Sequence, residues 1–226
     1  MKRISLIMLL ALFVSACSEK DNFSEPGESL NGVVLDQETG DSLQSQQPNG
    51  LRVRLYDLQY SSPQPIDFWG KQDGSFQNTR LFPGKYDMIV DNGGFYDIDT
   101  LSIELPTEEE FQIEVLPFLR ISAEVEKLDG ETIVVKSQLE ETKSEGNIVE
   151  RAVFVNSTPY VDFNNFINDN PIINTESVAK EELTNQVLSD TISNLESGKT
   201  YYIRAGAVKD EAKGNYNYSK IIKVAL

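Results

Sequence analysis

The sequence predicts an all-β protein made of two tandem β-sandwich domains. Short runs alternate apolar and polar residues with a period of two, clusters of Gly, Pro, Asn and Asp interrupt these runs, and the only helix candidates are short ones within 162–185. A period of two places one face of each strand on a core and the other in water. Frequent turn signals between such strands are typical of sandwiches. The 226 residues suffice for one large or two small domains after a leader.

Residues 1–16 form a predicted signal peptide. Lys2 and Arg3 precede an apolar run over 4–14, and a Ser-Ala-Cys tripeptide ending at Cys17 follows. A short basic segment, an apolar segment too short to span a bilayer and small residues at a cleavage site are typical of secretion. Residues 14–17 resemble a bacterial lipobox, which implies that Cys17 becomes the lipidated N-terminus. An ordinary signal peptide with a coincidental cysteine is the alternative.

Lipidation of Cys17 would attach the protein to a membrane that it does not span. Two or more acyl chains give stable anchoring because each buried methylene contributes roughly 0.8 kcal/mol. No later segment of the sequence has the roughly 20 consecutive apolar residues of a membrane-spanning helix. We expect residues 17–28 to form a flexible acidic tether. The acidic residues behind Cys17 resemble the export signal of lipoproteins on the outer-membrane surface of Bacteroidota, which implies surface display.

Composition excludes several kinds of function. The chain has one cysteine and no histidine, which excludes Ser-His and Cys-His nucleophilic sites and the usual zinc ligand sets. It has 36 acidic and 20 basic residues, and loss of Lys2 and Arg3 with the leader leaves 18 basic residues and a net charge of −18. Such a charge repels phosphate backbones and anionic membranes, so we expect no nucleic-acid partner. We expect no cofactor and no metal.

The first predicted domain covers residues 29–117 and contains three spaced turn signals. They are a turn over 36–40 that ends in Gly, a tight hairpin turn at 73–74 and a Pro-Gly turn at 83–84. Gly tolerates the positive φ that such turns require. This order resembles carboxypeptidase-regulatory-like (prealbumin-like) sandwich domains. Val33 and Leu35 are interpreted as part of a strand. The inward positions of the other strands are Leu51, Val53, Leu55, Tyr86, Met88, Val90, Leu101, Ile103, Leu105, Phe111, Ile113 and Val115.

The second predicted domain covers residues 118–226, because Pro117 interrupts a long β region and proline cannot donate to a central ladder. Leu195, Gly198 and Tyr201 resemble the tyrosine corner of fibronectin type III domains, in which the Tyr hydroxyl bonds the upstream backbone. The segment over 161–182 is longer and more polar than such a domain needs, and it is either a tolerated surface loop or a functional segment. Along 201–207 we expect Tyr201, Ile203, Ala205 and Ala207 inside and Tyr202, Arg204 and Gly206 outside.

One sequence block resembles the signature of a family of two-domain lipoproteins of unknown function in Bacteroidota. The block consists of Asp73, Gly74, Ser75, Phe76, Asn78, Leu81, Phe82, Gly84 and Tyr86. The resemblance implies association with outer-membrane glycan-uptake systems, beside a TonB-dependent transporter and its glycan-capturing lipoprotein. It supplies no catalytic residues. Within the block we expect Phe76, Phe82 and Tyr86 to lie in the core.

Sugars bind to the faces of aromatic rings and to amide and carboxylate groups, so exposed aromatic residues are the candidate ligand-binding residues. Those expected at the surface are Tyr60, Trp69, Phe95, Tyr96, Tyr160, Phe163, Phe166, Tyr216 and Tyr218, and our candidates among them are Trp69, Tyr96, Tyr216 and Tyr218. Burial in a core or domain interface is the alternative. The segment 91–99 offers oxygen ligands suited to calcium, but its spacing fits no established calcium loop, and a hairpin turn with solvated acids is the favoured interpretation.

The predicted function is that of a non-catalytic lipoprotein of the cell envelope, an accessory glycan-binding component of an outer-membrane polysaccharide-uptake system. One alternative is a structural or docking partner of a TonB-dependent transporter, and another is an adhesin-type surface protein without glycan affinity. A glycosidase is a further alternative because such enzymes need only two carboxylates.

Overall fold

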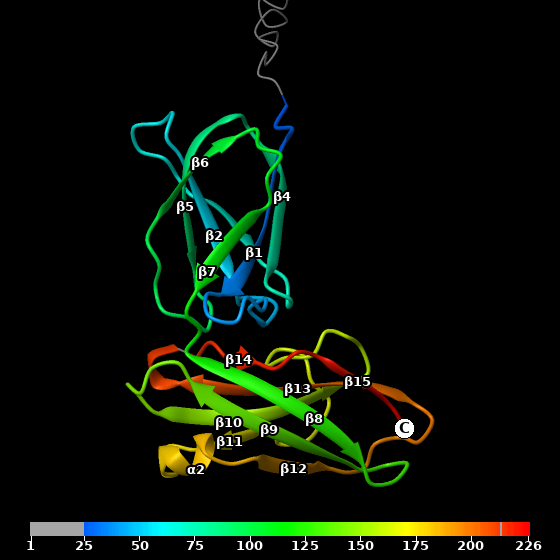
Figure 1. Cartoon of the computed structure of the whole chain (residues 1–226). Helices are drawn as coiled ribbons and strands as arrows, with labels where there is room; N and C mark the ends of the chain where they lie inside the picture. Colours follow the sequence, from blue (N-terminus) through cyan, green and yellow to red (C-terminus); the bar gives the residue numbers. More distant parts are fainter. Residues whose placement is uncertain (1–24, 213) are drawn as a thin grey trace, which may run out of the picture.

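The computed structural model describes residues 25–212 and 214–226 and shows two β-sandwiches stacked on each other (Figure 1). The strands of the first sandwich run along the long axis of the molecule, and those of the second lie across it. The predicted all-β architecture of two tandem sandwiches is confirmed. The predicted leader, Cys17 and most of the tether lie outside the described residues. In the described part of the chain, no helix is long and apolar enough to cross a membrane.

The first sandwich packs a three-stranded sheet on a four-stranded sheet. The first sheet has the order β4-β1-β7, with β7 parallel to β1, and the second has the order β3-β2-β5-β6. Alternating apolar residues of both sheets form one core, as the sequence predicts. The strands are β1 (Glu28–Asp36), β2 (Arg52–Asp57), β3 (Ile66–Trp69), β4 (Ser75–Leu81), β5 (Gly84–Asp91), β6 (Leu101–Leu105) and β7 (Phe111–Val115).

The turns at 73–74 and 83–84 carry the chain between the two sheets. The expected hairpin at 73–74 is wrong, because β3 pairs with β2 whereas β4 pairs with β1. Gly74 has φ +80°, and a Cβ there would lie 2.3 Å from the carbonyl oxygen of Leu43, so no other residue fits. Phe76 and Tyr86 are buried as predicted. Phe82 is 42% exposed, because it follows the last residue of β4, where the alternation ends.

The second sandwich packs the sheet β12-β9-β8 on the sheet β11-β10-β13-β14, to which β15 adds beside β13. The predicted tyrosine corner is confirmed: Tyr201 is buried, and its hydroxyl accepts a hydrogen bond of 2.8 Å from the backbone N–H of Glu196. The elements are β8 (Leu119–Lys127), β9 (Ile133–Glu141), β10 (Ile148–Asn156), β11 (Ile172–Asn174), α2 (Lys180–Thr184), β12 (Leu188–Ile192), β13 (Thr200–Lys209), the 3-10 helix η1 (Asp210–Ala212), β14 (Asn217–Tyr218) and β15 (Ile222–Ala225).

Arg204 is fully buried at the junction of the two domains. Its side chain leaves the expected face of β13, but the first domain covers that face, so the expectation of solvent exposure is wrong. The guanidinium donates across the junction to the carbonyl oxygens of Ser45 (2.8 Å) and Gln72 (3.1 Å), and within its own domain to that of Ser219 (3.0 Å). Its carbon also lies 4.2 Å from the centre of the Tyr218 ring.

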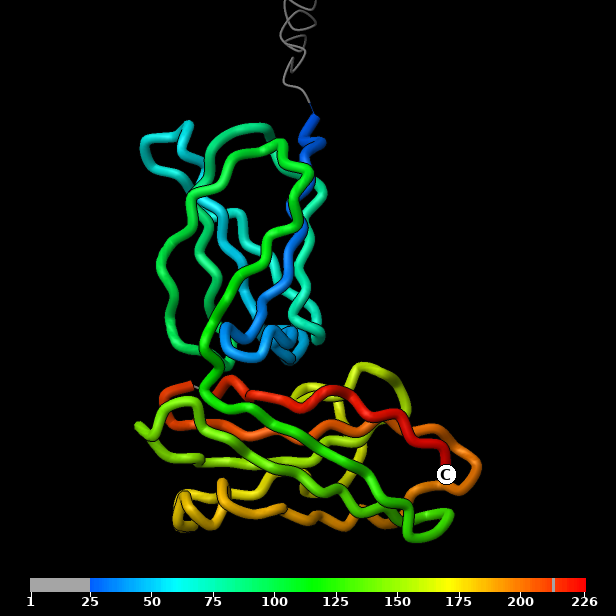
Figure 2. The backbone as a smooth tube through the Cα atoms, in the orientation of Figure 1, coloured from blue at the N-terminus to red at the C-terminus, as the bar shows by residue number. Residues whose placement is uncertain are grey.

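The polar segment that follows β10 also holds the first domain. The buried carboxylate of Asp162 accepts hydrogen bonds of 2.8 Å from the backbone N–H of Gln47 and from the side chain of Gln72. Asn164 donates to the carbonyl oxygen of Pro48, and Asn165 to that of Gln47. Figure 2 shows the blue loops of the first domain against the red C-terminal segment of the second. Residues 161–165 of the second domain therefore bind the first domain through hydrogen bonds.

We predict that Tyr201→Phe lowers the free energy of unfolding by about 1 kcal/mol, because the N–H of Glu196 loses its acceptor in a partly buried place. Urea denaturation measures the change. Tyr160→Phe is the matched control, because Tyr160 is 61% exposed. Equal stability of the wild type and Tyr201→Phe would contradict the role of this hydrogen bond.

We also predict an acid-dependent contribution from the ion pair between Asp36 of the first domain and Arg120 of the second. Burial raises the pKa of Asp36, but hydrogen bonds from Arg120 and the backbone N–H of Glu38 outweigh it and hold the pKa below its usual range. The contribution is therefore full above the unfolded pKa of about 3.9 and is lost as the pH falls through the lower folded value.

Urea denaturation of the wild type and Asp36→Asn at several pH values tests this dependence. The wild type should be more stable by a constant margin between pH 5 and 7, roughly the range above the unfolded pKa, and the margin should shrink at lower pH. A margin that does not change with pH would show that the carboxylate charge of Asp36 does not stabilise the fold.

Candidate ligand-binding surface at the domain junction

Tyr216 and Tyr218 are buried, which corrects the expectation that they face solvent. They are 3% and 5% exposed and lie over Gly206, where a Cβ would come within 3.0 Å of the Tyr216 ring. The Tyr216 hydroxyl donates to the carboxylate of Glu150 (2.7 Å), and the Tyr218 hydroxyl donates across the junction to Gln46 (3.0 Å). Burial raises the pKa of both hydroxyls. The Tyr216 ring packs against Phe154, Phe163 and Tyr218 of its own domain, whereas Tyr218 also reaches the first domain, so neither ring offers a free face to a ligand.

Tyr96 is half-buried at the same junction, and two side chains contact its ring. The Phe118 ring approaches it edge-on with 4.5 Å between centroids, and the Lys143 ammonium lies 3.9 Å from its centroid. Burial, together with the nearby carboxylate of Glu211, raises the pKa of Tyr96 to about 12. Its neighbour Phe95 is 5% exposed and belongs to the core of the first domain, so the expectation that Phe95 is exposed is wrong.

Trp69 is the candidate whose ring is open to solvent, with 42% of the residue exposed. It is the last residue of the edge strand β3, and it lies directly across from Arg52 of β2, which in turn lies across from Asp91 of β5. Residues that are paired across strands share one face of the sheet. Trp69, Arg52 and Asp91 therefore form a row on the outer face of this sheet, which we call the Trp69 row.

Ion pairs hold the charged side chains of this face. Arg52 lies 5.8 Å from the centre of the Trp69 ring and pairs with Asp67 at 2.5 Å, while Arg54 pairs with Asp91. Both carboxylates lie diagonally across a strand from their arginine, within reach of a long side chain. The pairs restrict the side chains around Trp69, so the ring is presented from a preorganised surface.

The Trp69 row leads into a cleft of about 400 Å³ between the two domains. Asn92, at φ +57°, fixes the wall of this cleft by donating 3.0 Å hydrogen bonds to the carbonyl oxygens of Asn49 and Gly50. Five of the eleven lining residues carry amides or carboxylates, which suits a ligand rich in hydroxyl groups. The residues that line the cleft include Arg52, Asp91, Asn92, Gly93, Tyr96, Asp97, Phe118, Glu211 and Asn215.

Sequence reasoning missed the contribution of the second domain to this cleft. Glu211 lies in η1, and Asn215 follows it in the turn before β14. Neither residue belongs to a sequence motif, and each lies beside the first domain only because the two domains pack together.

The calcium alternative for 91–99 loses one of its candidate ligands, because the carboxylate of Asp91 is paired with Arg54. The described residues contain no group of three or more His, Cys, Asp or Glu side chains arranged to hold a metal.

Comparisons place the chain among known proteins. Residues 28–116 match the N-terminal domain of the DUF3823 family of proteins of unknown function, and residues 119–223 match its C-terminal domain. No curated protein matches the chain.

Three solved structures of about the same extent show the same fold. A DUF3823 family protein from Bacteroides uniformis is 24% identical with a TM-score of 0.77, and a candidate carbohydrate-binding protein from the same species is 23% identical with a TM-score of 0.75. A DUF3823 family protein from Parabacteroides merdae is 19% identical with a TM-score of 0.73. Each similarity covers 89% of this chain and 100% of the other. The two sandwiches and both domain matches show that this chain belongs to the DUF3823 family.

Proposed function

We propose that this protein is a non-catalytic glycan-binding component of a polysaccharide-uptake system at the outer membrane. The observation that carries the proposal is the open ring of Trp69 on a rigid sheet, next to a cleft lined with amides and carboxylates. An exposed tryptophan supplies a large apolar face against which the C–H face of a sugar ring packs. The surrounding polar groups then fix the orientation of the ligand.

Charged and amide groups near Trp69 supply the hydrogen bonds that a sugar ring requires. Asp67 and Asp91 accept from hydroxyl groups and Arg52 donates to them, and bonds to charged groups are stronger than neutral ones. Because Asp67 and Arg52 are paired, their side chains lose little further freedom when the ligand binds. The similar Bacteroides uniformis structure described as a candidate carbohydrate-binding protein supports the same ligand class.

The proposed location follows from the lipobox at the N-terminus. A lipid on Cys17 holds the protein on the outer membrane, with the two sandwiches on the cell surface. The partners in this proposal are a TonB-dependent transporter and its glycan-capturing lipoprotein. Docking to that transporter without glycan affinity is the second candidate, favoured by the fixed junction around Arg204, since a rigid arm keeps a docking surface in one orientation.

Affinity electrophoresis in gels that contain polysaccharides tests the glycan-binding surface. At least one polysaccharide of a broad panel should retard the wild type, and Trp69→Ala should weaken the binding roughly fivefold, as expected for loss of about 1 kcal/mol of aromatic packing. Tyr60→Ala is the control, because Tyr60 is 68% exposed but lies beyond the other end of β2, away from Arg52.

Two results would count against glycan binding at Trp69. One is the absence of retardation by every polysaccharide, and co-purification of such a protein with a transporter would favour the docking role. The other is an equal loss of affinity in Trp69→Ala and Tyr60→Ala.

Metabolic labelling with a radioactive fatty acid tests the anchor. The wild type should incorporate label and partition into membranes, whereas Cys17→Ala should lose both properties, because Cys17 is the only cysteine in the chain. A wild type that incorporates no label and is washed from membranes would overturn the lipid anchor. The glycan-binding surface would not be affected by that result, because affinity electrophoresis tests it separately.

A further inference from the structure

The end of the first domain that points away from the second carries three exposed apolar side chains. Leu58 and Tyr60, in the loop between β2 and β3, are 49% and 68% exposed, and Phe82, at the corner between β4 and β5, is 42% exposed. The two segments are held together, since the side chain of Gln59 donates to the carbonyl oxygen of Pro83 (3.1 Å) and the N–H of Leu58 donates to that of Lys85 (2.9 Å). We call these three residues the apolar end.

The loop that bears Leu58 and Tyr60 is also uncharged. Residues 58–65 contain no Asp, Glu, Lys or Arg, in a chain with 25% charged residues. Residues 42–51, at the opposite end of the same domain, form a second uncharged stretch, and the second domain covers them there through contacts of Ser45, Gln46 and Gln47. The loop at the apolar end lacks charged residues, as the covered stretch 42–51 does, yet no part of the described chain covers it.

The chain enters the first domain at this apolar end. Glu28, at the start of β1, pairs with Leu81, the residue directly before Phe82 (Figure 1). Seven residues lie between Cys17 and Glu25, where the described chain begins, so eight Cα–Cα steps join the two. A fully extended chain of this length spans at most about 30 Å. A lipid on Cys17 therefore keeps Glu25, three residues before β1, within about 30 Å of the bilayer surface.

We propose that the apolar end rests on the lipid bilayer, with Leu58, Tyr60 and Phe82 among the headgroups. The inference rests on the lipid anchor proposed above. An amphipathic tyrosine suits the membrane interface, where its ring is apolar and its hydroxyl is hydrated. The anchor holds the apolar end at a high effective concentration beside the membrane, so three side chains suffice for contact.

Local charge selects the kind of lipid. Residues 108–110, in the loop between β6 and β7, are three glutamates at the same end of the domain, since Leu105 at the end of β6 pairs with Gly84. They repel anionic headgroups. The contact is therefore with uncharged groups of the lipid layer, and vesicles of phosphatidylcholine, which has no net charge, are the matching probe.

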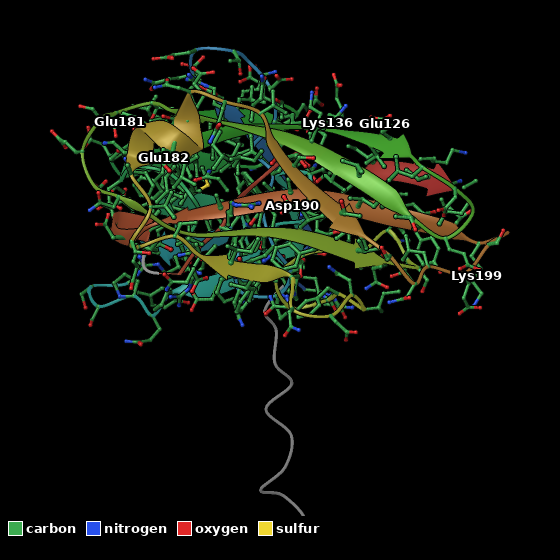
Figure 3. All side chains as sticks on the ribbon, turned by 90° about the horizontal axis from the view of Figure 1, so that it is seen from below. Glu126, Lys136, Glu181, Glu182, Asp190 and Lys199 are labelled. Atoms are coloured by element: carbon green, nitrogen blue, oxygen red, sulfur yellow. The ribbon has the colours of Figure 1, made fainter. Side chains whose placement is uncertain are left out.

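This contact sets the orientation of the whole molecule. The Trp69 row, at the other end of the first domain, is held above the membrane, and the outer face of the second domain points away from it. Figure 3 shows that outer face, with Glu126, Lys136 and Asp190 on it. The charged face is then directed at the medium or at a partner.

Fluorescence of the full lipidated chain in phosphatidylcholine vesicles tests the orientation. Tyr60→Cys and, as a control, Tyr160→Cys introduce one free thiol each for an environment-sensitive dye, at positions that are 68% and 61% exposed. The dye at position 60 should shift to shorter wavelength on reconstitution and be quenched by brominated lipid. The dye at position 160, in the second domain, should do neither.

Equal quenching of both dyes by aqueous iodide in the vesicles, with no shift at position 60, would overturn the inference. A second measurement needs no dye. Hydrogen exchange of the backbone amides at 58–62 should be slower in the lipidated chain in vesicles than in the unanchored Cys17→Ala variant in solution, and equal exchange would also overturn the inference. If the chain carries no lipid and does not insert into vesicles, both the anchor and this orientation are overturned. Retardation of the same protein by polysaccharide would still support the glycan site.

Discussion

A buried guanidinium between two domains is the interaction on which this architecture depends. Burial lowers the pKa of Arg204 to about 10, while the nearby Tyr218 and Asp162 offset part of that effect, so the side chain stays charged at neutral pH. A charge without water must be surrounded by acceptors. Carbonyl oxygens from both domains provide them, and Gln72 links the parts because its carbonyl accepts from Arg204 while its amide donates to Asp162. Separation of the domains would break the hydrogen bonds of Arg204 to Ser45 and Gln72, which favours a closed junction.

This junction explains which predictions from the sequence succeed and which fail. The alternation in β2 and β5 identifies buried residues such as Val53 and Met88, because it depends on local backbone geometry. The same alternation places Arg204 on the correct face of β13, but it contains no information about a second domain that covers that face. The expectation that Tyr218 is exposed is wrong for the same reason, since its hydroxyl bonds Gln46 of the first domain. Tyr216 is covered by Phe154 and Phe163 of its own domain, a contact that the local sequence does not encode.

The residues of the candidate site likewise differ in whether the sequence could identify them. Trp69 is among the residues expected at the surface from the sequence, and Arg52 stands at a polar position of the alternating run that forms β2. Glu211 and Asn215 could not be identified from the sequence, because the junction brings them to the cleft from more than a hundred residues further along the chain. The polar segment around Asp162, which the sequence left open as a surface loop or a functional segment, is a structural part of the interface. A ligand site built across two domains therefore depends on the same polar contacts that fix their relative orientation.

The central claim is that the two sandwiches form one rigid body. Residual dipolar couplings of backbone amides, measured separately for 28–116 and 119–223 in one weakly aligned sample, test it most directly. A fixed junction predicts that both domains yield the same alignment tensor in magnitude and direction, in agreement with the orientation in Figure 1. Tensors of different magnitude would show that the domains move independently, and that result would contradict the rigid arm and the cleft that it forms.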